Sequence, residues 1–328
     1  MSKLRIPGLA GLVGLAKLPG IFWSFSRLGY GRRAETFGEL EDCAGKTVLI
    51  TGANSGLGLA ASRILISRGA RVLMLFRNLR RGEIAIRDVR NSAKLGGSAE
   101  LLIADMTNMT SIRRVAKTLA DEAIHALVHN AGSLNSKRML TDDGLEFDFA
   151  LHVLGPHLLT TLLASALRKT RGRVIFVASG GMYSERFSLA ANNWEGRTYD
   201  GVKAYAQAKR TQVVLASLWD KHEKEFSTYA MHPGWVDTPG VESSLPTFYK
   251  RLKRWLRTPA EGADTIVWLA TKTSAPTPSG TFWFDRQSVS PYMLPYTRES
   301  ADESEKLWAA LEAHRECRAL EGLLQHPR

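Results

Sequence analysis

Cysteine is scarce in this 328-residue chain, and the scarcity narrows the class of protein. The two cysteines, Cys43 and Cys317, lie far apart and match no spacing of a zinc site or redox pair. A disulfide-rich secreted scaffold is therefore excluded, and a reducing intracellular setting is favoured. His125 and His129 are excluded as a metal pair, because four residues along a strand separate them by roughly 13 Å. We expect no metal site.

Acidic residues are missing from the first 34 positions, where basic residues supply half of the formal net charge of +12. These residues are Lys3, Arg5, Lys17, Arg27, Arg32 and Arg33. No nucleic-acid-binding motif accompanies them, so nucleic acid is not an expected partner. A basic and apolar start is more typical of a segment that meets an anionic membrane surface, or of an organelle import signal.

The longest stretch poor in charge covers residues 6–26, with Lys17 as its single charge. Pro7, Pro19 and four glycines make it a poor membrane-spanning helix. Aromatic residues beside cations favour association with a membrane interface. A mitochondrial transit peptide, or a helix packed on the folded domain, stays open as an alternative, and so does a cytoplasmic location.

Short apolar runs alternate with helix-like segments along the rest of the chain. We expect strands at residues 47–50, 71–76, 101–103, 126–129, 173–178 and 227–231. This alternation predicts the α/β class: a single doubly wound domain with a mostly parallel sheet and helices on both faces. No repeat or linker interrupts it. The expected domain covers residues 44–328, and residues 1–43 form an N-terminal extension.

A glycine-bearing turn follows the first of these runs and reads Thr51-Gly52-Ala53-Asn54-Ser55-Gly56-Leu57-Gly58. Gly52 permits a tight turn, Gly56 lets the backbone approach a phosphate, and Gly58 lets the next helix close on the sheet. Free N–H groups at the start of a helix attract an anion. The strand, turn and helix therefore predict a site for a pyrophosphate.

A second motif pairs Tyr205 with Lys209, and a spacing of four puts both on one helix face. A cation there favours the phenolate, so we expect a lowered pKa for Tyr205. The pair Tyr199 and Lys203 has the same spacing but encloses Asp200 and Gly201, which are poor helix formers. Tyr183 is a weaker rival, because no lysine follows it at this spacing.

The spacing TGxxxGxG, the YxxxK pair and a serine (Ser179) directly after a strand together resemble the short-chain dehydrogenase/reductase family. Within it, SGGMY, YAQAKR, MHPGWVDTPGV and SGTFWFDR resemble the member-twelve branch. The resemblance implies a Rossmann-like fold and an oxidoreductase that interconverts a carbonyl and an alcohol. Tyr205 would exchange a proton with the substrate oxygen, Ser179 would hydrogen-bond that oxygen, and Lys209 would hold the nicotinamide ribose.

The resemblance also implies a set of residues around a nicotinamide cofactor. They are Thr51, Gly52, Asn54, Ser55, Gly56, Leu57, Gly58, Arg77, Asn78, Asp105, Met106, Asn130, Ala131, Gly132, Tyr205, Lys209, Pro233, Gly234, Val236 and Thr238. An acid at the end of the second strand would favour NAD. Arg77 and Asn78 stand there instead, and Arg77 could pair with a 2′-phosphate, so NADP(H) is the expected cofactor. A solvated arginine that opens a helix is the alternative.

One catalytic position departs from the family pattern, because His152 replaces an asparagine in FALHVLGP. In the family the main-chain carbonyl at this position binds a relay water. Pro156 has no N–H, so an α-helix would leave the His152 carbonyl without its usual donor. We hypothesise that His152 and Pro156 together preserve the relay; a weakened site is the alternative.

The expected partner is a small carbonyl or alcohol, and the family leaves a homo-oligomer open. The segment FYKRLKRWLR, residues 248–257, mixes aromatic and basic residues at helical spacing. It is either a solvated amphipathic helix or a second patch that faces a membrane. With the N-terminus it favours a lipophilic substrate. The alternative function is a catalytically silent NADP(H)-binding sensor or scaffold.

Overall fold

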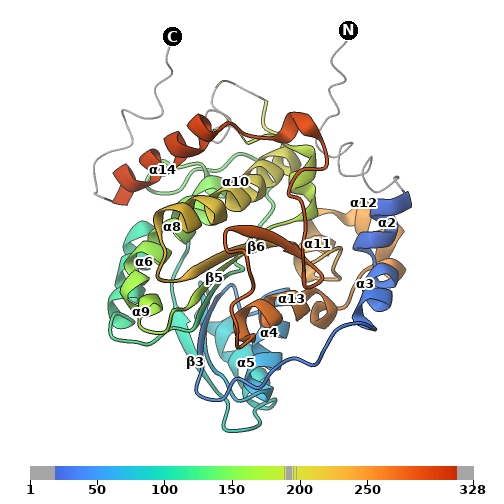
Figure 1. The fold of residues 1–328 in the computed structure, drawn as a ribbon. Coiled ribbons are helices and arrows are strands. Elements are labelled where there is room, and N and C mark those ends of the chain that lie inside the picture. Colours follow the sequence, from blue (N-terminus) through green and yellow to red (C-terminus); the bar gives the residue numbers. More distant parts are fainter. Residues whose placement is uncertain (1–18, 188, 190–193, 195, 197, 316–328) are drawn as a thin grey trace.

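The protein is a single α/β unit built on an eight-stranded sheet with the order β3-β2-β1-β4-β5-β6-β7-β8 (Figure 1). The computed structural model describes residues 19–187, 189, 194, 196 and 198–315. The strands are β1 Thr47–Thr51, β2 Arg71–Phe76, β3 Ser98–Ile103, β4 Ala126–His129, β5 Arg173–Val177, β6 Ser227–Met231, β7 Thr281–Phe284 and β8 Gln287–Ser288. All neighbouring pairs are parallel except β7 and β8, which confirms the predicted fold class.

Two hydrophobic layers cover the two faces of the sheet, which is why the inner strands β1, β4 and β5 are buried at every position. Alternate side chains of β1 show the division: Leu49 enters one layer, whereas Val48 and Ile50 enter the other. One layer is covered by α4 Gly56–Ser67, α5 Leu79–Arg90 and α13 Pro259–Thr271. The opposite layer is covered by α6 Met109–Thr118, α8 Gly155–Leu162, α9 Ala164–Arg168, α10 Gly201–His222 and α14 Ala301–Arg315.

Short elements join these layers and surround the carboxyl ends of the strands. They are α7 Phe147–Phe149, the π-helical turn η1 Ala150–Leu154, η2 Gly180–Ser184, α11 Pro239–Ser244, α12 Pro246–Leu252, η4 Lys253–Trp255 and η5 Pro295–Thr297. The segment 248–257, expected to be one helix, is divided between α12 and η4. Phe248 and Tyr249 are buried against Trp235 and Leu256, so its aromatic side faces the protein.

The N-terminal helices α2 Pro19–Phe25 and α3 Arg27–Ala34 pack on this domain beside α12 (Figure 1). Phe25 is 3% exposed, and its ring contacts those of His232 and Phe284. For residues 19–26 the structure therefore shows the packed alternative. Residues 6–18 of the same predicted stretch lie outside the described part. Within the described part, no helix combines the length and apolar character needed to cross a membrane.

Arg257 connects this N-terminal segment to the rest of the molecule. Its buried guanidinium binds both carboxylate oxygens of Asp285, at 2.6 and 2.9 Å. It also donates to the carbonyl oxygens of Ser24, Phe25 and Pro233 at 2.9 to 3.1 Å. Three segments distant in sequence thus meet at one side chain.

Candidate active site

The glycine turn lies where the strand order changes direction, between β1 and β4, which is where open α/β sheets bind ligands. Thr51 ends β1, and its Oγ1 accepts from the N–H groups of Asn130 and Ala131 at 3.1 and 3.0 Å. Asn130 Nδ2 in turn donates to the carbonyl oxygens of Thr51 and Gly52, both at 3.0 Å. Thr51 and Asn130 therefore fix the turn against the end of β4.

The turn needs its glycines because neighbouring backbone comes too close for a side chain. Gly52 has φ +66°, and a Cβ there would lie 2.7 Å from Ala131 Cα. A Cβ on Gly58 would lie 2.5 Å from Asn130 Nδ2. Exposed Ser55 is the N-cap of α4, and its side chain makes no capping bond, so the helix start is open to an anion.

The loop after β6 packs over the same turn. A Cβ on Gly56 would lie 3.2 Å from Thr238 Cγ2, which places Thr238 against the phosphate turn. Val236 and Leu57 both approach Gly262, at 2.5 and 2.7 Å from the position of its missing Cβ. Pro233 is held through its carbonyl by Arg257. The predicted residues Pro233, Val236 and Thr238 therefore lie on one loop, which packs against the glycine turn.

Tyr205 and Lys209 lie one turn apart on α10, as their spacing predicted. The helix begins at Gly201, after the N-cap Asp200, whose carboxylate accepts the Lys203 N–H at 3.1 Å. Tyr199 therefore precedes the helix, and its hydroxyl donates to Asp148 Oδ2 at 2.9 Å. The hydroxyl of the other rival, Tyr183, donates to the Ser290 carbonyl at 3.1 Å.

Ser179 follows β5, and its side chain interacts with the Tyr205 phenol. Lys209 Nζ donates to the Val177 carbonyl at 2.8 Å and to Gln212 Oε1 at 3.0 Å. The same Nζ lies 5.5 Å from the centre of the Tyr205 ring. Serine, tyrosine and lysine are therefore brought together at the carboxyl end of β5.

Burial shifts the pKa values of Tyr205 and Lys209, and for Tyr205 the shift is opposite to the one that the sequence predicted. It raises the pKa of Tyr205 to about 12, against the opposing effect of Ser179, and Asp148 raises it further. Burial also lowers the pKa of Lys209 to about 7. The expected lowering of the Tyr205 pKa is therefore wrong for this structure, because desolvation penalises both the phenolate and the ammonium.

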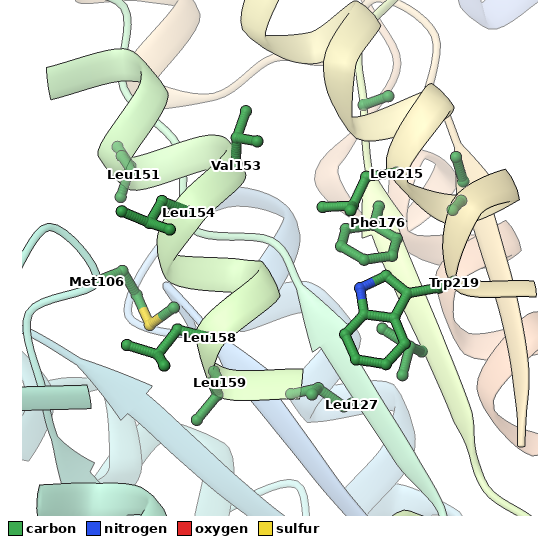
Figure 2. Packing of buried hydrophobic residues seen from close by; sticks show 14 of the residues in the cluster. Met106, Leu127, Leu151, Val153, Leu154, Leu158, Leu159, Phe176, Leu215 and Trp219 are labelled. Carbon is green, nitrogen blue, oxygen red and sulfur yellow. The ribbon is translucent and has the colours of Figure 1, made fainter. Parts of the chain in front are cut away.

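His152 lies in the π turn η1, whose five residues are all buried. Leu151, Val153 and Leu154 beside it pack into the core with Leu158 and Met106 (Figure 2). The His152 ring meets the Tyr205 ring edge-on, with centres 5.4 Å apart. Burial and the nearby Lys209 hold the pKa of His152 well below its ordinary value, so the imidazole is neutral.

The π turn η1 lies directly before Pro156. Gly155 N–H donates to the Ala150 carbonyl, five residues back rather than four. The π register ends at Leu154, and α8 begins at Gly155 with Pro156 in its first turn. The predicted release of the His152 carbonyl and the main-chain relay therefore stay predictions.

The remaining predicted residues lie around the ends of β2 and β3. Arg77 Nη1 is 3.6 Å from Asp105 Oδ2, and its side chain is 69% exposed. Asn78 caps α5 by accepting the Arg81 N–H at 3.0 Å. The Met106 side chain belongs to the core. A cavity of about 650 Å³ opens beside Asp105. None of these contacts links these residues to Tyr205. This separation is expected if the two groups hold opposite ends of a dinucleotide.

The site residues predicted from the sequence do not include Asp148, which is buried in the centre of the site. His152 Nδ1 bonds to its carbonyl oxygen at 3.0 Å and lies 3.5 Å from its Oδ1. Tyr199, the rival of Tyr205 in sequence spacing, donates to its Oδ2. The spacing of four between Asp148 and His152 was the available signal, since it puts both on one helical face.

The observed residues fit a dinucleotide: bare glycines beside an open helix start, and a lysine and tyrosine beyond them. The short chain dehydrogenase family model matches residues 46–247. Dehydrogenase/reductase SDR family member 12 from Bos taurus is 38% identical over 88% of this chain and 93% of its own length. Retinol dehydrogenase 14 from Homo sapiens is 31% identical over 90% and 94%, respectively.

Solved structures share the same architecture. A crystal structure of a protein from Mycobacterium paratuberculosis superposes with a TM-score of 0.66 at 28% identity, covering 84% of this chain and 95% of the other. L-Sorbose reductase from Gluconobacter frateurii gives a TM-score of 0.61 at 20% identity, with 78% and 99% covered. At this identity the second comparison shows the fold alone.

Proposed function

Because the chain belongs to the short-chain dehydrogenase family, as its motifs predicted, we propose that it is an NADP(H)-dependent oxidoreductase that interconverts a carbonyl and an alcohol. The predicted likeness to the member-twelve branch is also confirmed. The observation that carries the proposal is the grouping of Ser179, Tyr205 and Lys209 beside the Asn130–Gly132 segment and the glycine turn.

The roles of the protein's own groups follow from their charges. The Tyr205 phenol is protonated at neutral pH, so it can donate a proton to a carbonyl oxygen. Ser179 supplies a second hydrogen bond to that oxygen. Lys209 orients the cofactor ribose, and Thr51 to Gly58 hold the pyrophosphate. The bound nicotinamide supplies or accepts the hydride.

Arg77 supports NADP(H) over NAD(H). It stands at the end of β2, where an acid would hold the ribose hydroxyls and exclude a 2′-phosphate. Its exposed guanidinium touches Asp105 only at 3.6 Å, so it can turn towards a phosphate without losing a buried ion pair.

A lipophilic substrate is proposed from the relatives and from the surface near α2. Retinol dehydrogenase 14 and a polyprenol dehydrogenase from Danio rerio are similar over most of this chain, and both names denote apolar alcohols. Trp23 and Leu28 are exposed large apolar side chains on α2 and α3. A membrane surface that meets these helices would deliver such a substrate.

The experiment that tests the function is Tyr205→Phe assayed against a panel of lipophilic aldehydes and ketones with NADPH. Turnover is expected to fall at least about 100-fold while NADPH affinity is kept. Tyr183→Phe is the matched control, because it removes a phenol hydroxyl outside the catalytic group, and it should keep turnover. Equal activity of wild type and Tyr205→Phe would contradict the proposal.

His152 in place of asparagine favours one second candidate, a silent NADP(H)-binding sensor or scaffold. Such a protein would bind NADPH equally well in the wild type and in Tyr205→Phe, and neither would oxidise it in the presence of any carbonyl.

A further inference from the structure

Basic side chains gather where the N-terminal helices meet α12 and η4. They are Arg27, Arg32 and Arg33 on α3, Lys250 and Arg251 on α12, Lys253 and Arg254 on η4, and Arg257 after it. Arg33 and Arg257 turn inward, because both bind the buried carboxylate of Asp285. The other six residues are all exposed.

No acidic residue balances these six exposed cations. The sequence has no aspartate or glutamate in residues 19–34 or in residues 243–260. Within the part of the chain that the structure describes, no carboxylate forms an ion pair with any of the six. Unbalanced charges of one sign raise the local potential and attract opposite charge within a Debye length of about 10 Å. The charge therefore favours a polyanionic partner.

Apolar side chains lie among these cations. Trp23 on α2 is 45% exposed, and Leu28 on α3 is 37% exposed. The ring of Phe22 meets the ring of Trp255 edge-on, with centres 5.9 Å apart. The Arg254 guanidinium lies 4.7 Å from the centre of the Trp255 ring. The N-terminal helices and η4 thus share one surface.

We call this the basic–aromatic surface. It consists of Trp23, Arg27, Leu28, Arg32, Lys250, Arg251, Lys253, Arg254 and Trp255.

The basic–aromatic surface is fixed on the domain before any partner binds. A Cβ on Gly29 would clash with the Trp23 carbonyl oxygen, so α3 packs directly on the backbone of α2. Phe25 is buried, and Arg257 donates to the carbonyl oxygens of Ser24 and Phe25. A surface held in this way loses little conformational entropy when it binds.

The combination of cations with tryptophan and leucine selects among polyanions. At a bilayer interface an indole ring lies at the level of the headgroups, and lysine and arginine meet anionic lipids. An apolar layer beneath the headgroups can cover Trp23 and Leu28. Double-stranded nucleic acid presents phosphates but no such layer. An anionic bilayer is therefore the partner that fits both the charge and the apolar side chains.

Trp235 connects this surface to the proposed active site. Its ring contacts those of Phe22 and Phe248, with centres 6.0 and 5.4 Å apart. It stands in the loop after β6, next to Val236, which packs towards the helices beside the glycine turn. Contact with a lipid surface would therefore occur beside the site proposed for the nicotinamide cofactor.

We propose that the basic–aromatic surface binds the headgroup region of a bilayer that contains anionic lipids. Trp23 and Leu28 enter the interface, and the six cations lie at the lipid phosphates. This inference rests on the proposed function, because an oxidoreductase that acts on lipophilic alcohols finds its substrate in a bilayer. Its test, however, measures binding alone.

The test is co-sedimentation of the full chain with phosphatidylcholine vesicles, with and without about 30% phosphatidylserine. Wild type should bind the anionic vesicles and lose most of this binding between about 0.1 M and about 0.5 M salt, because the charges are screened. Lys250→Ala combined with Arg251→Ala should weaken binding roughly 20-fold, at about fivefold for each cation. Trp23→Ser should also weaken it but leave the salt dependence unchanged.

Arg87→Ala combined with Lys94→Ala is the matched control. It removes the same charge from two exposed residues on and after α5, which lies away from α2 and α12 (Figure 1). This variant should bind the anionic vesicles as wild type does. Every substituted side chain is exposed, so circular dichroism should show a folded chain in each case.

Three results would overturn the proposal. They are wild-type binding by the variant that lacks Lys250 and Arg251, equal binding to vesicles with and without phosphatidylserine, and tighter binding to a DNA duplex than to anionic vesicles. The last result would favour a nucleic acid as the partner. A loss of binding confined to variants of the basic–aromatic surface supports the proposal.

The outcomes also separate this inference from the proposed function, because vesicle binding is measured without substrate or cofactor. Binding by a wild type that turns over no carbonyl would overturn the proposed function alone. Carbonyl turnover by a wild type that does not bind anionic vesicles would overturn the membrane surface alone.

Discussion

Arg77 decides cofactor choice at the scale of one side chain. Arg77→Ala should raise the KM for NADPH about 10- to 100-fold, because a charge-assisted contact to the 2′-phosphate is lost. The KM for NADH should change little, since NADH has no 2′-phosphate. Steady-state kinetics with both cofactors check this, and Arg87→Ala near the end of α5 is the control. Equal losses with NADPH and NADH would remove Arg77 from the 2′-phosphate site.

Asp148 also predicts how stability depends on pH. Its pKa is raised from 3.8 to about 7, so the folded state holds a proton that the unfolded state releases between these values. The folded state binds more protons there, so the unfolding free energy falls as pH rises, by about 1.4 kcal/mol per pH unit from this group. Asp148→Asn removes this loss.

Urea unfolding of wild type and Asp148→Asn at several values between pH 4 and pH 7 measures the difference. The variant should gain stability relative to wild type as pH rises, which also separates any loss of activity from loss of fold. A difference that does not vary with pH would mean that the carboxyl group titrates normally.

Individual residues differ in how far the sequence reveals them. The partners Tyr205 and Lys209 follow from a spacing of four, because helix geometry is local. Their pKa values do not follow, because desolvation depends on β5 and on the turn at His152, which are remote in sequence. Asp148 escaped notice for the same reason: a carboxylate looks solvated until its burial is known.

At the scale of elements, the inner parallel strands were readable because burial on both faces makes their sequences largely apolar. Predicted and observed bounds agree for β2, β4 and β6. The pair β7 and β8 was not predicted, because β7 is short and β8 has two exposed residues. The π turn at residues 150–154 was also missed, since no side-chain pattern distinguishes it from an α-helix.

At the scale of the whole molecule, the N-terminal helices α2 and α3 pack on the domain as a part of it. Deleting residues 1–26 removes Phe25 and two carbonyl oxygens that Arg257 binds, and should lower the unfolding free energy by about 3 kcal/mol or more. Deleting residues 1–18 is the control, because it keeps all of these contacts. Chemical denaturation measures both. Equal stability of the two deletions would show that α2 contributes no packing energy.

The ion pair between Arg33 and Asp285 joins the first described helices to the turn after β7. During translation, Arg33 leaves the ribosome more than two hundred residues before its partner does. The ring of Phe25 on α2 therefore stays uncovered until its partners His232 and Phe284 have left the ribosome. Packing of the N-terminal helices on the domain thus follows the synthesis of β7, and nascent chains of this protein are expected clients of holding chaperones.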